Sequence, residues 1–253
     1  MVLYFQVIFS NIRWQMICQE NNIDISRGQL LKILWQGLFF NQIFPSGVGG
    51  DFIRAYRLKT FTKKFNISLS LVIWDRFFGI FALSVLSLLG IPYFIKLGHY
   101  EIVLVSLIIF LFLSFLFVFL PVLSNLKFLE KYMSDILDQY STIRSKKFFS
   151  QLIVFSIFIQ LFSVMSIYLI FLSLGIQINF PALFLLVPLS ILGMSLPISF
   201  AGWGVREGIM IFILGLLQIG QEQALLISII FGLSLFFISI PGIIFWLNNA
   251  NAK

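Results

Sequence analysis

Uncharged apolar stretches long enough to cross a membrane constrain this chain more than any other feature. They cover residues 77–95, 102–126, 148–205 and 223–252. A helix needs roughly 20 predominantly apolar residues to cross the hydrocarbon layer of a bilayer. Because 60% of the residues are hydrophobic and the mean hydropathy is +1.02, the chain is predicted to be an all-α, polytopic transmembrane helix bundle.

The stretch 148–205 is too long for one crossing. The residues Asn179-Phe180-Pro181, which follow Gly175, supply a turn within it. We therefore expect one span over 151–174 and another that begins at 181.

Two segments near the amino terminus, 2–18 and 29–44, are weaker candidates for membrane helices. Polar side chains interrupt them and would have to face protein or water: Arg13, Lys32, Gln36, Asn41 and Gln42. With these segments included, we expect about seven or eight hydrophobic segments.

Cationic residues are concentrated in two loops, 51–66 and 124–150, whereas the loop 96–101 contains only Lys96. Cytoplasmic loops carry an excess of Lys and Arg. We therefore expect both basic loops to be cytoplasmic and the protein to be integral to the inner cell membrane. This distribution explains the net charge of +7 without a nucleic-acid partner, which we do not expect.

The whole chain, 1–253, reads as a single membrane domain in two halves, 1–123 and 148–253, joined by a linker over 124–147. Apolar residues in the linker follow the spacing of one helix face: Leu126, Leu129, Met133, Ile136, Tyr140 and Ile143. An amphipathic helix on the inner membrane surface is favoured over a coiled coil that binds a partner, because two heptads alone are marginally stable.

One motif, Pro-x3-small-Gly-x3-Arg, occurs once in each half. The first copy runs from Pro45 through Gly49 and Gly50 to Arg54. The second copy has Pro197, Ala201, Gly202 and Arg206 at the matching positions. Interrupted apolar segments at corresponding places in two halves point to a substrate site in membrane transporters, so we predict two broken or re-entrant helices in a two-half pseudo-repeat.

The chemistry of this motif favours an anion. Proline lacks an N–H group and glycine frees the backbone, so one helix ends and another begins inside the membrane. The amide groups at the new N-terminus attract phosphate or carboxylate, and Arg54 or Arg206 adds a guanidinium about one turn further on. The alternative is that the glycines allow close helix packing and that Pro45 ends a helix at the cytoplasmic face.

Charged residues beside the motif predict a network. A charge at the centre of a membrane helix costs about 2.5–3.5 kcal/mol on insertion scales, so such charges normally pair. Neighbouring residues on a helix diverge, so we do not expect Asp75 to neutralise Arg76, or Glu207 to neutralise Arg206. We predict pairing across the bundle among Asp51, Arg54, Asp75, Arg76, Arg206 and Glu207. An interfacial Asp75-Arg76 pair remains the alternative.

Several kinds of chemistry find no support in the sequence. The single cysteine, Cys18, excludes an internal disulfide, and the single histidine, His99, excludes a His-rich metal site. Phe52 occupies the third glycine position of a dinucleotide-binding motif. We therefore assign no catalytic residue, no metal and no cofactor.

These residues lie in segments that resemble the transmembrane, flippase-like region of the lysylphosphatidylglycerol synthase family. The similar segments include RWQMICQ, GLFFNQIFPSGVGGDFIRAYRLK, VIWDRFFGIFAL and the stretch that begins LPISFAGWGVREG. The resemblance implies a role in moving or presenting anionic or glycosylated lipids. It also places Trp203 and Gly204 among the site residues, with Gly49, Gly50, Asp51, Arg54, Asp75, Arg76, Gly202, Arg206 and Glu207.

By this resemblance, the chain begins inside what is usually a second helix and ends without a soluble aminoacyltransferase domain, so synthase activity is not expected. We expect a protein that binds an anionic lipid headgroup and assists its translocation, with Arg54 and Arg206 on the phosphate. The alternatives are a membrane enzyme that acts on phospholipid or polyprenyl phosphate, with Asp51 or Asp75 as general base, or a scaffold for a lipid-modifying enzyme.

Overall fold

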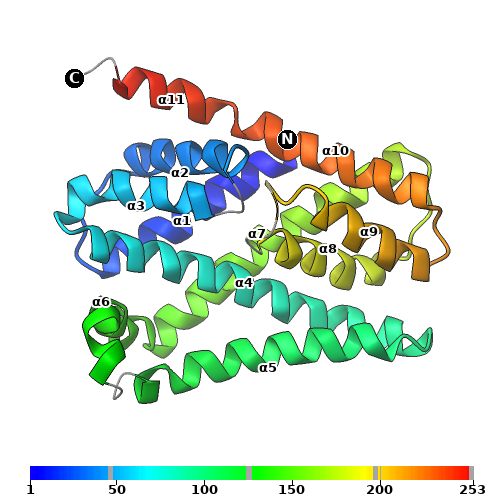
Figure 1. The fold of residues 1–253 in the computed structure, drawn as a ribbon, viewed down its shortest axis with the longest axis horizontal. Helices are drawn as coiled ribbons and strands as arrows, with labels where there is room; N and C mark the ends of the chain where they lie inside the picture. The colour runs from blue at the N-terminus through cyan, green and yellow to red at the C-terminus, as the bar shows by residue number, and fades with distance from the viewer. Residues whose placement is uncertain (45–47, 124–126, 196–198, 200, 251–253) are drawn as a thin grey trace.

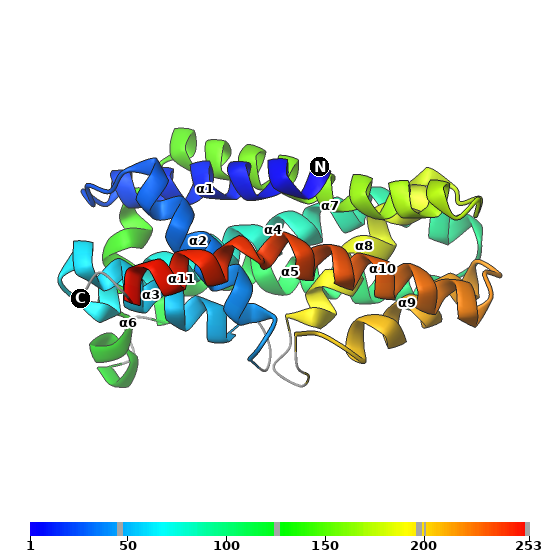
Figure 2. The same ribbon diagram turned by 90° about the horizontal axis from the view of Figure 1, so that it is seen from above.

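The protein folds into a bundle of α-helices in the computed structural model, which describes residues 1–44, 48–123, 127–195, 199 and 201–250 (Figures 1 and 2). These residues contain no strand, which confirms the predicted all-α class. The helices are α1 (Val2–Glu20), α2 (Arg27–Asn41), α3 (Val48–Thr62), α4 (Phe65–Lys96), α5 (Tyr100–Leu123), α6 (Lys127–Ile143), α7 (Lys146–Ser173), α8 (Phe180–Met194), α9 (Val205–Leu216), α10 (Gln221–Ser239) and α11 (Pro241–Ala250).

Four helical stretches of the described chain are long and apolar enough to cross a membrane. They are Phe65–Lys96, Tyr100–Leu120, Lys146–Ser173 and Gln221–Asn248, the last formed by α10 and α11 together. The predicted division of the stretch 148–205 is confirmed, although the connection lies at 174–179, because α7 ends at Ser173 and α8 already begins at Phe180. The chain is thus an integral membrane protein with a polytopic helical fold.

Two pairs of short helices form hairpins where the sequence predicts broken helices. The helices of each pair, α2 with α3 and α8 with α9, pack against one another, and each helix is too short to cross a bilayer alone. Both views show the end of α2 and the start of α3 near the middle of the molecule, next to the end of α8 and the start of α9, while the two hairpins extend toward opposite ends (Figures 1 and 2). Pro45 and Pro197, predicted to break the helices, lie outside the described residues.

The contacts between helices follow an inverted two-half plan. Within each half, the second hairpin helix packs on the long helix that follows it: α3 on α4, and α9 on α10. Between the halves, each long helix packs on the first hairpin helix of the other half: α4 on α8, and α10 on α2. Helices α1 and α7 contact each other across the centre. Because the two hairpins open toward opposite ends, the halves have opposite orientations, as in the inverted repeats of secondary transporters.

The two basic segments predicted as loops, 51–66 and 124–150, are mostly helical, as α3 and α6, and the short connections that follow these helices lie at one end of the bundle. Lys63 and Lys64 connect α3 to α4 at the left of Figure 1, and α6 lies at the same end. The loop that contains His99 lies at the opposite end. This arrangement is consistent with both basic segments facing the same side of the membrane. That this side is the cytoplasm stays a prediction.

The predicted amphipathic linker forms helix α6, which packs against α4 and α5. Of its apolar stripe, Tyr140 and Ile143 are buried and Ile136 packs on the core. Leu126 lies outside the described residues. The described part of the stripe therefore faces the bundle.

Candidate functional site

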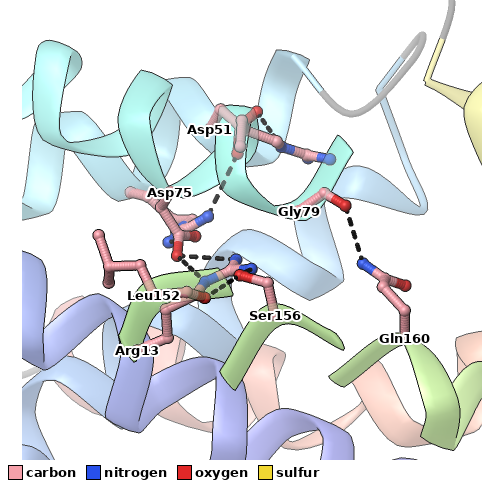
Figure 3. A network of polar contacts seen from close by, with 9 residues as sticks. Arg13, Asp51, Asp75, Gly79, Leu152, Ser156 and Gln160 are labelled. Atoms are coloured by element: carbon pink, nitrogen blue, oxygen red, sulfur yellow. Dashed lines mark hydrogen bonds and ion pairs between the residues drawn. The ribbon is translucent and has the colours of Figure 1, made fainter. Parts of the chain in front are cut away.

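An arginine and aspartate cluster lies where α1, α3 and α4 meet (Figure 3). The Asp75 carboxylate accepts a hydrogen bond from Arg13 Nε at 2.9 Å and another from Arg54 Nη2 at 2.7 Å. Asp51 accepts from Arg76 Nε at 2.5 Å, and its other oxygen lies 3.5 Å from Arg54 Nη1. Predicted pairing across the bundle is thus present in the first half, where Arg76 pairs with Asp51 from another helix.

Further contacts hold the cluster in place from α7. Arg13 Nη1 donates to the Ser156 hydroxyl at 2.9 Å, and that hydroxyl donates to the Leu152 carbonyl at 2.6 Å. Gln160 Nε2 donates to the Gly79 carbonyl of α4 at 3.2 Å (Figure 3). The cluster therefore joins four helices, α1, α3, α4 and α7, and its hydrogen bonds orient the guanidinium groups.

Aromatic packing supports Arg54 from the other side. Its guanidinium lies over the ring of Trp14, 4.0 Å from the ring centroid, and Trp14 is fully buried. A cation over an indole face is attracted by the electrons of the ring, more strongly when both are desolvated. Arg54 is therefore held by a ring and by two carboxylates.

The first glycines of the motif serve packing rather than a helix break. Gly49 and Gly50 lie in the first turn of α3, and a side chain at Gly50 would collide with the Gly37 carbonyl and with Asn41. The Gly50 N–H donates to Asn41 Oδ1 at 2.9 Å. The Gly50 amide, predicted to be free for an anion, is already bonded, and Gly50 lets α2 and α3 approach closely, while Gly49 packs against Phe44.

A cavity of about 200 Å³ adjoins the cluster. Both hairpins contribute to its wall, through Asn41 at the end of α2 and Ser195 just after α8. Its other polar lining residues are Gln6, Ser10, Arg13, Arg54, Asp75, Arg76 and Gln160. Among the described residues, the buried Arg54 Nε has no hydrogen-bond partner. The cavity therefore has a largely polar wall beside the cluster.

The charges around this cavity do not balance. In the part of the chain that the structure describes, the cluster contains three guanidinium groups, those of Arg13, Arg54 and Arg76, and two carboxylates, those of Asp51 and Asp75. Arg13 and Arg54 are each only 5% exposed, and Asp75 is 3% exposed. A surplus positive charge in such a place is costly unless an anion compensates it.

A second cluster lies at the start of α9. Arg206 Nη2 donates to the Glu207 carboxylate at 2.6 Å, and Arg206 Nε donates to the Ser228 hydroxyl of α10 at 2.9 Å. The prediction that Glu207 would not neutralise Arg206 is wrong. At the first turn of a helix the chain has no preceding turn, so Glu207 folds back, caps the Gly204 N–H and meets the long Arg206 side chain.

Gly202 and Gly204 shape the second break, as predicted. Their φ angles are +78° and +85°, a region that side chains disfavour, and α9 begins directly after them at Val205. The ring of Trp203 between them covers Arg206, with the guanidinium carbon 4.5 Å from the ring centroid. The Gly204 amide, expected to be free for an anion, is instead capped by Glu207.

Arg54 and Arg206 belong to separate clusters. Arg206 is 1% exposed, and it is not among the described residues that line the cavity beside Arg54. A single pocket formed by both arginines therefore does not match this geometry. The reason is packing: the Arg206 guanidinium lies against Gly232 of α10, inside its own half.

Arg13 is the site residue that the sequence prediction left out. It interrupts an otherwise apolar segment, and that interruption was the signal that could have found it, because a buried charge needs a partner. The two carboxylates of the site are both occupied by arginines. Among the described residues, no group of three His, Cys, Asp or Glu side chains could hold a metal ion.

Comparison with known proteins agrees with this architecture. The profile of the family described as "Lysylphosphatidylglycerol synthase TM region" matches residues 1–242. Curated proteins and solved structures give no significant match. With nearly its whole length matched, two inverted hairpins and membrane-crossing helices, the chain belongs to the lysylphosphatidylglycerol synthase TM region family.

Proposed function

We propose that this protein binds the phosphate of an anionic membrane lipid at the Arg13, Arg54 and Arg76 cluster and assists its movement between leaflets. The observation that carries the proposal is that, among the described residues, the cluster beside the cavity has one more guanidinium than carboxylates. A phosphate would supply the missing negative charge and accept hydrogen bonds from guanidinium groups that line the cavity.

The inverted hairpins support the translocation part of the proposal. Both hairpins contribute to the cavity wall, through Asn41 of one half and Ser195 of the other. Rocking one half against the other would expose such a site to each side in turn, as in transporters built from inverted repeats. In this proposal, Arg206, Trp203, Gly202 and Gly204 hold the second hairpin in shape rather than contact the lipid. The inner cell membrane is the proposed location.

Leaflet exchange in reconstituted vesicles tests this function. Fluorescent phosphatidylglycerol should move to the outer leaflet faster in proteoliposomes than in empty vesicles, as measured by dithionite quenching. Fluorescent phosphatidylcholine should move much less. Product formation from donor and acceptor lipids without exchange would favour the enzyme alternative, and exchange only with an added lipid-modifying enzyme would favour the scaffold.

A matched pair of variants connects exchange to the cluster. Arg76→Gln removes the most exposed arginine of the site, whereas Arg57→Gln removes an arginine of α3 that stacks on Trp246, 4.4 Å from its ring centroid, outside the cavity. We expect Arg76→Gln to slow phosphatidylglycerol exchange by about tenfold or more, the effect of losing one charged hydrogen bond of roughly 1.5–3 kcal/mol. Arg57→Gln should retain exchange. Equal rates in both variants would contradict the proposal.

A further inference from the structure

A second cavity, lined mainly by apolar residues with Glu101 and Ser195 as its polar lining residues, adjoins the arginine site. It has a volume of about 600 Å³, within the usual range of ligand pockets of roughly 300–1,000 Å³. Four helices line it, through Ile80 of α4, Val105 and Ile109 of α5, Leu192 of α8, and Ile209 and Phe212 of α9. We call it the α5–α9 groove.

The groove and the arginine cavity share part of their walls. Ile80 and Ser195 line both. Ile80 is on the same helix as Asp75 and Arg76, and Ser195 ends the α8 arm of the second hairpin. The arginine cavity can therefore hold the anionic headgroup of a lipid while the adjoining groove holds its apolar chain.

The groove is open to the bilayer on its α5 side. Val105 is 47% exposed and Phe212 is 61% exposed, while α5 packs mainly on α4 and α6. Exposed apolar residues at the mouth of an apolar cavity in a membrane protein face lipid rather than water. A lipid chain can thus enter sideways between α5 and α9.

The groove lies in one half of the membrane. Its α5 residues belong to the first turns of that helix, next to the α4–α5 loop, at the end opposite the basic loops (Figure 1). Helices α8 and α9 approach from that same end. A chain in the groove therefore lies in the leaflet opposite the basic loops, with its headgroup near the bundle centre.

We infer that the α5–α9 groove holds an acyl chain of the same lipid whose phosphate occupies the arginine cavity, and that this lipid enters or leaves between α5 and α9 in the leaflet opposite the basic loops. The inference rests on the proposed function and deepens it. The ligand class becomes a glycerophospholipid bound by head and chain together, so a free phosphate compound fills only the polar part of the site.

Photochemical cross-linking tests the inference. The probe is phosphatidylglycerol with a diazirine in one acyl chain, in phosphatidylcholine vesicles that contain the protein, with adducts located by mass spectrometry. We expect adducts on α5 and α9 at the groove, and weaker labelling by the matching phosphatidylcholine probe. Arg76→Gln should reduce the groove adducts, because head and chain belong to one molecule.

Neighbouring residues of α5 supply the control. Ile109 lines the groove, whereas Ile108 is 64% exposed and does not line it among the described residues. Ile109→Trp fills the groove and should reduce the adducts by about tenfold, whereas Ile108→Trp should leave them unchanged. Adducts spread evenly over the outer surface of α5, or equal labelling by both probes, would show ordinary boundary lipid and overturn the inference.

Exchange rates in the same vesicles separate this inference from the proposed function. Groove adducts that depend on Arg76, without lipid exchange, would support the chain site and overturn translocation. Exchange that depends on Arg76, with adducts elsewhere, would support translocation and overturn the chain site.

Discussion

Asp75 of α4 and Arg54 of α3 form an ion pair of 2.7 Å in the interior of the bundle, 3% and 5% exposed respectively. Asp75 also accepts from Arg13, so one carboxylate holds two arginines from two other helices. The pair fixes the first hairpin against α1 and α4. Because Asp75 is shared by two arginines, the cluster carries a net positive charge among the described residues. This charge is the basis of the proposed lipid site.

Removing the Asp75 charge should destabilise the fold. Asp75→Asn leaves Arg13 and Arg54 buried without their carboxylate, which typically costs about 3–5 kcal/mol in the free energy of unfolding. Unfolding in detergent, followed by circular dichroism, measures this loss. The double variant Arg54→Gln with Asp75→Asn should lose less than the sum of its single variants, because the two residues interact directly. Strict additivity would contradict the pairing.

The packing of Arg206 predicts different responses of two glycines. A side chain at Gly232 would collide with the Arg206 guanidinium, whereas one at Gly79 would meet Arg13 at an ordinary 3.6 Å. Gly232→Ala should therefore destabilise the protein by about 1–3 kcal/mol through overpacking, and Gly79→Ala should not. Thermal unfolding of the two variants in one detergent gives the comparison. Equal melting temperatures would contradict the described position of Arg206.

The turn before α9 predicts a second contrast. Gly204 has a φ of +85°, so Gly204→Ala should cost about 1–3 kcal/mol in stability. Gly208, one turn later, is helical with open space around it, so Gly208→Ala should raise stability by about 0.5–1 kcal/mol. Opposite shifts in melting temperature are expected; a tolerated Gly204→Ala would contradict the turn.

Orientation in the membrane is testable with single cysteines. The chain has one cysteine, Cys18, which is buried, so a Cys18→Ser background is simple to prepare. Lys63→Cys and Arg144→Cys should react with an impermeant maleimide only from the cytoplasmic side, and His99→Cys only from the opposite side. Labelling of positions 63 and 144 from different sides would contradict the fold.

Periodicity and uncharged length were enough to predict the fold class and the two interrupted segments. These features arise from the bilayer itself, which requires long apolar helices and makes each interruption costly. The pairing of Asp51 and Asp75 with arginines followed from the same cost.

The predictions that were wrong concern contacts that depend on tertiary packing. The role of Gly50 depends on where α3 begins. Because α3 begins at Val48, Gly50 lies inside the helix and lets α2 approach. Whether Arg206 reaches the Arg54 cavity depends on which face of α9 meets α10. The interruption of an apolar segment by Arg13 indicates a buried partner, but that this partner is Asp75 depends on the packing of α1 beside α4.

The change in melting temperature on addition of lipid tests most directly whether the arginine cluster binds an anion. A ligand that binds only the folded state raises its stability, by about 2.7 kcal/mol at a hundred times its dissociation constant. Phosphatidylglycerol added to protein in neutral detergent should therefore raise the melting temperature of the wild type and of Arg57→Gln, but not that of Arg76→Gln, and phosphatidylcholine should raise none. Equal shifts with both lipids, or a full shift in Arg76→Gln, would contradict an anion site at the arginine cluster.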